Sequence, residues 1–515
     1  MKKINLLLLL VFVCFACQKQ ESYSPVADPL SNYYEASLKP FYHGVASGDP
    51  LQNAVIIWTK VTPEDSLPEL SVQWEISENE NFDEPTQTGE VITNADKGYT
   101  VKVDVNGLEP NTKYFYRFNY EGANSLIGET QTAPSESNEA LRLAIVSCSN
   151  YEFGPFNGYG ALAERNDIDV VLHLGDYIYE YGEKGYGDTT TGRFHMPPHE
   201  IITLEDYRTR YAQYRLDKDL REVHQRIPFI TIWDDHEIAN DSYVDGAQNH
   251  QENEGDYNDR KAAARKAYYE WLPIRESKEL YRSFSYGDMA DLIMLDERLA
   301  GRVAPVKSAD DPNIASEERL MLGTEQLSWF KNELSESDAQ WKIIGNQVIF
   351  SYLNWGFPTF QLNLDSWDGY PYERTEIINH IRNEQVENVV FVTGDTHSSW
   401  ALEVTEDAFS DYKTNGAVAV EFGTTSINSG NTNDRAGTTD ETVMEHEQNI
   451  TGSPLNPQLK YANLRDHGYL ELILSNDQAE AIWHYTPDKR VASREMVVGK
   501  KLITKSGSNK IEEQQ

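Results

Sequence analysis

The sequence predicts an α/β protein preceded by a small all-β domain, and three features support this fold class. A short apolar run ends in Gly175-Asp176 in DVVLHLGDYIYEY (169–181), and two further runs end in clustered Asp and His in PFITIWDDHE (228–237) and NVVFVTGDTH (388–397). Such runs are typical of strands buried on both faces, as in a parallel sheet. Helical patterns lie between them, as doubly layered α/β folds require. By contrast, residues 39–134 contain only short runs separated by Pro, Gly and Asn, which is typical of an all-β domain.

The first 38 residues are typical of an export signal followed by a tether. Lys2 and Lys3 precede an apolar run, 6–16, that is too short to span a bilayer in the usual way. The run ends in Ala16-Cys17, which resembles the lipobox of bacterial lipoproteins, where cleavage leaves the cysteine as a lipidated N-terminus. We therefore expect residues 1–17 to be a lipoprotein signal peptide and residues 18–38 to be a polar tether.

The predicted lipid on Cys17 implies an exported protein, anchored to the outer membrane on its periplasmic or cell-surface side. Cys14 stands where a lipobox usually has Leu, and the alternative is an ordinary cleaved secretory signal. The chain has 83 acidic and 45 basic residues and a net charge of −38, which repels nucleic acid and anionic lipid headgroups. We therefore expect no nucleic-acid-binding surface, membrane contact only through the lipid, and a monomer.

Residues 39–135 are predicted to form an accessory β-sandwich. LEPNTKY (108–114) resembles the tyrosine corner of fibronectin type III domains, in which a Tyr hydroxyl bonds back to the preceding turn. Thr132-Ala133-Pro134 ends the domain in the manner of such modules. Because this region carries no catalytic constellation of its own, the chemistry is expected in the remainder of the chain.

Residues 140–500 are predicted to form the α/β domain. Apolar runs predict strands at 141–147, 169–175, 228–233, 291–296, 341–346, 388–394 and 417–422, and helical patterns lie at 204–220, 259–271, 324–334 and 373–382. Thr324 is the expected N-cap of the third helix. Residues 469–474 and 479–485 are expected to form a hairpin, and 501–515 a frayed tail.

Cys148 closes the apolar run 141–147, which is a fourth strand of the same kind. Removal of the signal leaves only Cys17 and Cys148, and a lipidated Cys17 excludes a disulfide within the chain. Metal ligation explains a lone thiol in an oxidising compartment. The alternative is an inert buried cysteine, which is a common case.

Carboxylates and imidazoles follow the other strands of this type. Asp176, Asp235 and His397 each stand at or just beyond a strand end, at the edge of the sheet where open α/β folds bind ligands. Taken singly, the aspartates fit turns or helix caps, and His397 fits a hydrogen-bonded loop residue. Together they predict a metal site for hydrolysis. The polar segments 182–200 and 241–256 leave the same edge and are either walls of the site or inert surface loops.

Several motifs then match a known family in its order. SCSN (147–150), HLGDYIYEY, WDDHEIAN (233–240), LDER (295–298), MLGTEQLSWF (321–330), DSWDGYPYER (365–374) and GDTHSSW (394–400) resemble those of the PhoD-type alkaline phosphatases, a branch of the calcineurin-like metallophosphoesterases. The resemblance covers nearly the whole mature chain. It implies a four-layer β-sandwich flanked by helices, with a metal cluster at strand ends.

The resemblance also implies a ligand set. Cys148, Asp176, Tyr179 and His397 are expected to hold Fe3+, while Asp176, Asp235 and Asp395 are expected to hold Ca2+, with Asn240 as a further contact. Thiolate, phenolate and imidazole suit iron, and carboxylate oxygen suits calcium. The same residues also suit Zn2+ or another divalent metal.

The family's activity implies a metal-dependent phosphoesterase that releases phosphate from monoesters and also cleaves diesters. His236 is expected to act as the acid towards the leaving oxygen, and Arg298 to clamp the phosphate. The alternative for Arg298 is a salt bridge to Asp296 or Glu297, and His467 is expected to help close the site. Rival functions are a phosphodiesterase acting on phospholipid or teichoic-type polymers, and a surface binding protein without turnover. Family members often carry a twin-arginine signal, whereas this chain has Lys2-Lys3, so we expect metal loading after export.

Overall fold

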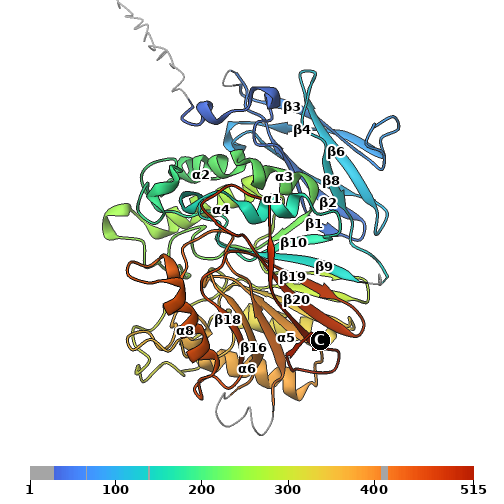
Figure 1. Cartoon of the computed structure of the whole chain (residues 1–515). Coiled ribbons are helices and arrows are strands. Elements are labelled where there is room, and N and C mark those ends of the chain that lie inside the picture. Colours follow the sequence, from blue (N-terminus) through green and yellow to red (C-terminus); the bar gives the residue numbers. More distant parts are fainter. Residues whose placement is uncertain (1–27, 65–66, 137–139, 407–415, 515) are drawn as a thin grey trace, which may run out of the picture.

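Two sheets packed face to face form the centre of the molecule (Figure 1). The computed structural model describes residues 28–64, 67–136, 140–406 and 416–514, so the predicted signal peptide lies outside the described residues. The first sheet has the order β22 (Glu512–Glu513), β21 (Val497–Lys505), β20 (Gln478–Tyr485), β19 (Gly468–Leu474), β9 (Leu141–Val146), β10 (Val170–His173), β11 (Phe229–Thr231), β1 (Val45–Leu51), β2 (Ala54–Lys60) and β5 (Thr100–Asn106).

The second sheet has the order β12 (Arg282–Tyr286), β13 (Ala290–Met294), β14 (Trp341–Asn346), β15 (Val389–Thr393), β17 (Ala419–Gly423), β16 (Ser399–Val404) and β18 (Leu459–Asn463). Neighbouring strands β9, β10 and β11 run parallel in the first sheet, as do β13, β14, β15 and β17 in the second. The predicted α/β class and each predicted strand are therefore confirmed, with ends that differ by at most two residues.

Helices cover the outer face of each sheet. On the first sheet lie α1 (Asn157–Ala163), α2 (Leu204–Leu216), α3 (Lys218–Arg226) and α4 (Tyr257–Trp271); on the second lie α5 (Gly323–Glu336) and α6 (Pro371–Asn383), with α8 (Asp440–Thr451) beside β18 (Figure 1). Strand β15 shows how the layers form. Val390 and Val392 belong to the core between the sheets, whereas Phe391 packs with Phe330 and Ile378 of the helices. Successive strand residues point to opposite faces, so one apolar strand serves both layers.

The all-β domain is a sandwich, but it is not separate from the first sheet. Its second layer has the order β4 (Gln87–Thr93), β3 (Leu70–Ser77), β6 (Lys113–Tyr120) and β7 (Ala123–Asn124), with β8 (Gly128–Gln131) paired to β6. The other layer is β1, β2 and β5, and β1 pairs in parallel with β11 at Gly48 and Phe229. A Cβ on Gly48 would lie 2.5 Å from the Phe229 carbonyl, so only glycine permits this contact. The predicted tyrosine corner is confirmed, because the Tyr114 hydroxyl accepts from the Glu109 amide at 3.0 Å.

Two helix predictions need correction. The expected helix 204–220 is broken at Asp217, whose extended backbone ends α2 and whose carboxylate accepts from the amides of Asp219 and Leu220 to begin α3. The expected N-cap Thr324 lies inside α5, which begins at Gly323. Here Glu373, from a distant helix, accepts the Leu322 amide at 2.9 Å and takes over the capping role.

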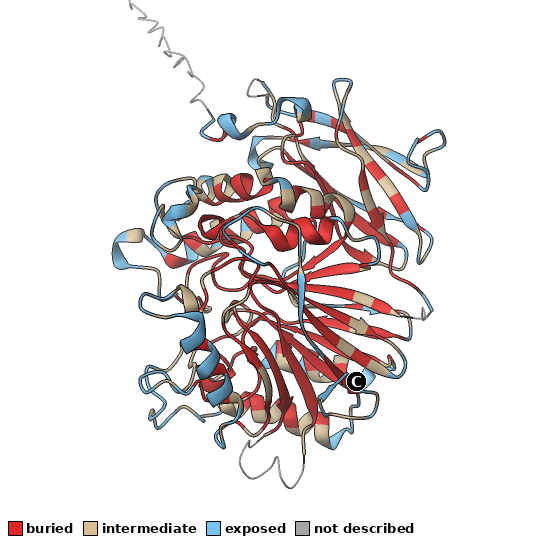
Figure 2. Ribbon diagram, in the orientation of Figure 1, coloured by how far each residue is buried: buried red, intermediate tan, exposed pale blue. Residues whose placement is uncertain are grey.

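Both ends of the described chain are more ordered than predicted. Residues 28–38, the expected end of the tether, are packed on the protein: Leu30 is buried, Tyr34 stacks on Tyr42, and Glu35 pairs with Arg221 at 2.8 Å. The expected frayed tail at 501–515 is also wrong, because β21 pairs along β20 and buries Leu502. Figure 2 shows the buried interior formed by the sheets. Among the described helices, none has the length and apolar character needed to cross a bilayer.

Candidate metal centre and active site

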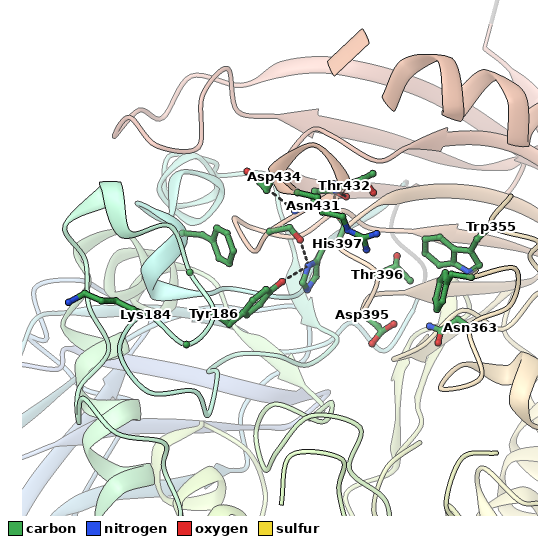
Figure 3. Close-up of a pocket in the computed structure, with 16 residues that line it drawn as sticks. Lys184, Tyr186, Trp355, Asn363, Asp395, Thr396, His397, Asn431, Thr432 and Asp434 are labelled. Carbon is green, nitrogen blue, oxygen red and sulfur yellow. Dashed lines mark hydrogen bonds between the residues drawn. The ribbon is translucent and has the colours of Figure 1, made fainter. Parts of the chain in front are cut away.

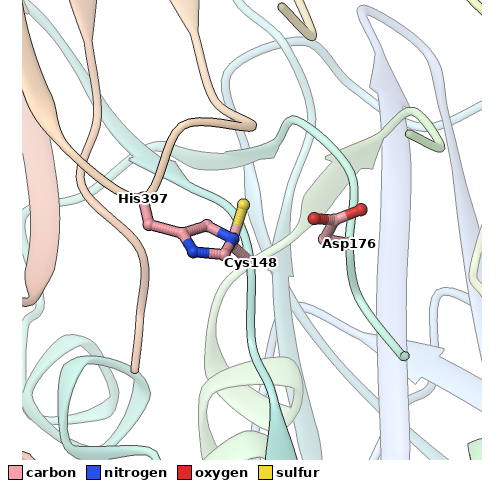
Figure 4. Close-up of side chains that lie close together, drawn as sticks. All are labelled: Cys148, Asp176 and His397. Carbon is pink, nitrogen blue, oxygen red and sulfur yellow. The ribbon is translucent and has the colours of Figure 1, made fainter. Parts of the chain in front are cut away.

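The predicted site residues lie where strand ends of both sheets meet. Cys148 follows β9 and Asp176 follows β10, while His397 follows β15 of the other sheet. Their ligand atoms (sulfur, carboxylate oxygen and imidazole nitrogen) all lie within 4.8 Å of one another, and the three side chains point toward each other (Figure 4). Parallel pairing of β9 and β10 brings Cys148 and Asp176 together, and the packing of the two sheets adds His397.

Tyr179 completes this group. Its hydroxyl lies 3.0 Å from Asp176 Oδ2 and 3.1 Å from His397 Nε2, and its ring is fully buried. All four residues expected to share one cation therefore meet at one point. The donor set combines one sulfur, one imidazole nitrogen, one phenol oxygen and one carboxylate.

A row of carboxylates adjoins this group on the side of Asp176. Ligand atoms of Asp176, Asp235 and His236 lie within 4.8 Å of one another, as do those of Asp234, Asp235 and Asp395. Asp235 thus links Asp176 to Asp395, the three residues expected to hold the harder cation. A further group joins Asp235 to Asp241 and Asp365, and neither of the latter two was expected at the site.

The backbone at these residues is unusual. Cys148, Asp176, Asp395 and His397 all have positive φ, between 56° and 60°. This left-handed conformation is uncommon outside glycine and concentrates at functional sites. Gly175, with φ of 105°, permits the approach of the next strand end, because a Cβ there would lie 2.3 Å from Asp234 Cβ. The Gly-Asp sequence is therefore required by the packing of the site.

His397 is held as a neutral ligand. Its Nδ1 lies 2.6 Å from the Gly430 carbonyl and so carries the proton, which leaves Nε2 as the acceptor facing Tyr179. Burial lowers the pKa of His397 to about 4. Asn431 donates to the His397 carbonyl at 2.7 Å and fixes the residue from its other side.

The remaining groups need a positive partner in order to ionise. Burial, then the nearby Asp176, raises the pKa of the Cys148 thiol well above its usual value, and the pKa of the Tyr179 hydroxyl is raised for the same two reasons. Burial and neighbouring carboxylates also raise the pKa values of Asp176 and Asp395, although His236 opposes the first and Arg298 the second. Asp234 Oδ2 and Asp235 Oδ1 are buried without a hydrogen-bond partner. Buried anionic groups of this kind are normally paired or bound to metal, so the residues fit a metal cluster.

His236 lies beside the carboxylates and is bound by a residue that the sequence analysis missed. Its Nδ1 bonds Glu180 Oε2 at 2.7 Å, and Glu180 Oε1 accepts from the Asn240 amide and the Asn249 side chain, both at 2.8 Å. Burial lowers the pKa of His236, but the carboxylates of Asp235, Asp176 and Glu180 outweigh it and hold the pKa well above its usual value. Glu180 follows Tyr179 directly in the sequence, and no pattern separated it from its polar and aromatic neighbours.

Arg298 is fully buried, and its partners differ from those expected. The guanidinium bonds Asp234 and, at 2.7 Å, Asp365, and it reaches Asp395 at 3.5 Å. The alternative of a side-chain salt bridge to Asp296 or Glu297 is therefore wrong. The Arg298 side chain points away from these two carboxylates and toward Asp234, Asp365 and Asp395. The Arg298 guanidinium is thus surrounded by carboxylates, and its contact with a substrate phosphate stays a prediction.

The two remaining candidate residues, Asn240 and His467, lie beside the predicted metal-binding groups and not among them. The Asn240 side chain donates to Gln248 at 3.2 Å, and no described contact joins it to the carboxylates. His467 is buried behind the site, where it bonds the Ser429 carbonyl at 2.8 Å and Lys489 at 3.1 Å. It thus supports the segment that carries Gly430, which in turn orients His397.

A cleft of about 520 Å³ opens beside Asp395 and His397 (Figure 3). Residues 184–187 line one part of it, so segment 182–200 is a wall of the site. Segment 241–256 also belongs to the site, through Asp241 in the carboxylate group and Asn249 on Glu180. A buried cluster of metal-binding groups, a charged imidazole and an open cleft are together suited to hydrolysis of an anionic ester.

Comparison with known proteins agrees with this geometry. The PhoD-like phosphatase family matches residues 143–483, and the N-terminal domain of PhoD-like phosphatases matches residues 28–134. Alkaline phosphatase D of Bacillus subtilis (strain 168) is 36% identical over 475 residues, which cover 87% of this chain and 78% of that protein. A solved structure of PhoD superposes with a TM-score of 0.83 at 32% identity and covers 92% of each chain.

Proposed function

Because this chain belongs to the PhoD-like phosphatase family, we propose that it hydrolyses both phosphomonoesters and phosphodiesters at the buried cluster described above. As a member of the family, it is a phosphoric ester hydrolase. The observation that carries the proposal is the convergence of Cys148, Asp176, Tyr179 and His397, from strand ends of two sheets, on one point. The open cleft beside them supports the diester activity, because a diester brings a second substituent.

For the metals, we propose Fe3+ held by Cys148, Tyr179 and His397, and Ca2+ held by Asp235 and Asp395, with Asp176 shared. Thiolate, phenolate and imidazole suit iron, whereas carboxylates suit calcium. When bound, the cations neutralise the phosphate ester and lower the pKa of a bound water. Zn2+ or another divalent ion in place of either metal is the alternative that elemental analysis distinguishes.

The chain's own residues supply the proton. His236 is held charged by Glu180 and two further carboxylates, so it is proposed to protonate the oxygen of the departing alcohol. The pairing of Nδ1 with Glu180 leaves Nε2 as the nitrogen available for this transfer. Arg298 is proposed to hold Asp234, Asp365 and Asp395 in place, and its guanidinium is near enough to this group to meet a bound phosphate.

The test compares ester hydrolysis by the wild-type protein with that of Asp176→Asn. With 4-nitrophenyl phosphate and bis(4-nitrophenyl) phosphate, we expect both activities in the wild type and their loss on chelation. Asp176→Asn should lower kcat at least about 1,000-fold, because it removes a shared ligand, while the fold is retained in circular dichroism. The control is Asp83→Asn on an exposed loop of the all-β domain. An unchanged rate in Asp176→Asn would remove this cluster from the reaction, and activity on one ester alone would reject the other half of the proposal.

We further propose that the chain is an exported lipoprotein anchored through Cys17. The support is the sequence of residues 1–17, which lies outside the described structure. Labelling cells with a fatty-acid analogue should mark the wild-type protein and leave Cys17→Ser unmarked. Equal labelling of both forms, or labelling of neither, would contradict the proposal.

A further inference from the structure

The cleft beside the metal centre has one aromatic side that no catalytic role requires. Trp355 and Phe360, here called the aromatic shelf, line it together with Tyr186, Asp395 and His397. In Figure 3, Tyr186 and Trp355 lie on opposite sides, with Asp395 between them. Phe360 is 42% exposed, although large aromatic side chains are usually buried. An exposed ring on a cleft wall is typical of a ligand contact.

Packing contacts and hydrogen bonds hold the aromatic shelf in position. Trp355 packs edge-on against Phe360, with ring centroids 5.4 Å apart, and against the buried Trp400 at 5.2 Å. The Trp355 amide donates to the Gln361 carbonyl at 2.8 Å, which closes the turn that presents Phe360. Trp400 Nε1 in turn donates to Thr396 Oγ1 at 2.8 Å. The shelf is thus fixed to the loop that carries Asp395 and His397.

The cleft also presents one unpaired cation among the described residues. Asp434, on its wall, is paired with Lys489 and with Arg490 at 3.1 Å, and Lys184 is paired with Glu183 at 2.5 Å. Arg435 lines the same cleft and is exposed, and no described carboxylate forms an ion pair with it. In a chain with a net charge of −38, an arginine left without an acidic partner beside the site is suited to bind an anion.

We propose that this cleft is the subsite for the alcohol portion of the ester, and that it favours alcohols carrying a flat ring and a further negative charge. The proposal rests on the proposed function. The aromatic shelf stacks against the ring, and Arg435 pairs with the additional anionic group. The reacting phosphate lies at the metal centre, so both contacts fall on the group that leaves. They set substrate preference and are not part of the hydrolytic machinery.

Four alkyl phosphates separate the two contacts: propyl, 4-carboxybutyl, benzyl and 4-carboxybenzyl phosphate. All are esters of primary alcohols, and each variant is compared with wild type on the same ester, so differences in leaving-group reactivity cancel. Phe360→Ala should lower kcat/KM about five-fold for both benzyl esters, mainly through KM, and leave the other two esters within two-fold. Arg435→Gln should lower kcat/KM about five-fold for both carboxylated esters alone.

Controls separate this proposal from general damage and from the proposed function. Tyr33→Ala removes an aromatic ring that is 51% exposed in the segment before the all-β domain, and Lys218→Gln removes a cation whose side chain is 71% exposed on α3. Neither should alter any of the four esters. If wild type hydrolyses none of the esters nor 4-nitrophenyl phosphate, the proposed function fails. If wild type hydrolyses them and Phe360→Ala and Arg435→Gln affect all four alike or none, the subsite is overturned and the hydrolase stands.

Discussion

Glu180 Oε2 lies 2.7 Å from His236 Nδ1, and both side chains are buried beside the carboxylates of the metal centre. Burial opposes ionisation of Glu180, but the charge and hydrogen bond of His236 lower the pKa of the carboxyl below its usual value. The two side chains therefore form an ion pair beside these carboxylates. In the proposed reaction Glu180 acts through His236 and is a positioning residue.

This pair gives a prediction that depends on the leaving group. Glu180→Gln removes the charge that stabilises the imidazolium, so kcat should fall about 100-fold for an alkyl phosphate, whose alcohol needs a proton to depart. The fall for 4-nitrophenyl phosphate should be about ten-fold or less, because nitrophenolate leaves without one. Steady-state kinetics on the two esters measure the difference. Glu80→Gln, exposed on the all-β domain, should change neither rate, and equal losses on both esters would show that Glu180 is only structural.

Gly175 gives a prediction for stability. Gly175→Ala places a Cβ 2.3 Å from Asp234 Cβ at a φ of 105°, so steric overlap adds to backbone strain. We expect a loss of about 3 kcal/mol or more in the free energy of unfolding, measured by urea denaturation. Gly192→Ala is the matched control, since Gly192 also has positive φ, 69°, but nothing lies within 4 Å of its Cβ position. Its loss should be about 1 kcal/mol. Equal losses would show that the contact with Asp234 carries no cost.

Glu471 makes folding stability depend on acid pH. Burial raises its pKa, but hydrogen bonds from His484 and Arg165 outweigh this and lower the pKa from 4.5 to about 2. A carboxyl with a lowered pKa in the folded state contributes stability that is complete above pH 4.5 and is lost as the pH falls toward 2. At pH 7, Glu471→Gln should therefore be less stable than wild type by about 1–2 kcal/mol, because Arg165, whose side chain is 25% exposed, leaves the pair partly screened by solvent.

The difference should shrink as the pH is lowered from 4.5 to 3, as measured by thermal unfolding in a series of buffers. The exposed Glu495→Gln serves as the control and should follow wild type at every pH. A difference between wild type and Glu471→Gln that stays constant down to pH 3 would mean that lost packing, and not ionisation, explains the effect.

Much of the fold followed from the sequence because buried parallel strands are short, apolar and closed by glycine or polar residues. The same rule placed Asp176 and His397, since each stands at the end of such a strand. The strand pattern does not indicate which loops, distant in the sequence, fill the space between the strand ends. Asp365, on a long loop, and Asp241, in a polar segment, could not be placed for this reason. The strand β21 was missed because its sequence, VVGKKLITK, does not alternate apolar and polar residues, and most of its first five residues are exposed near the edge of the sheet.

We propose that one sulfur, one phenol, one imidazole and one carboxylate bind a metal ion together. The most direct measurement is elemental analysis of the purified full-length protein beside Cys148→Ser and Tyr179→Phe. We expect bound iron and calcium in wild type, with iron lost from both variants and calcium largely retained. Retention of the same metals in both variants, at wild-type amounts, would contradict it.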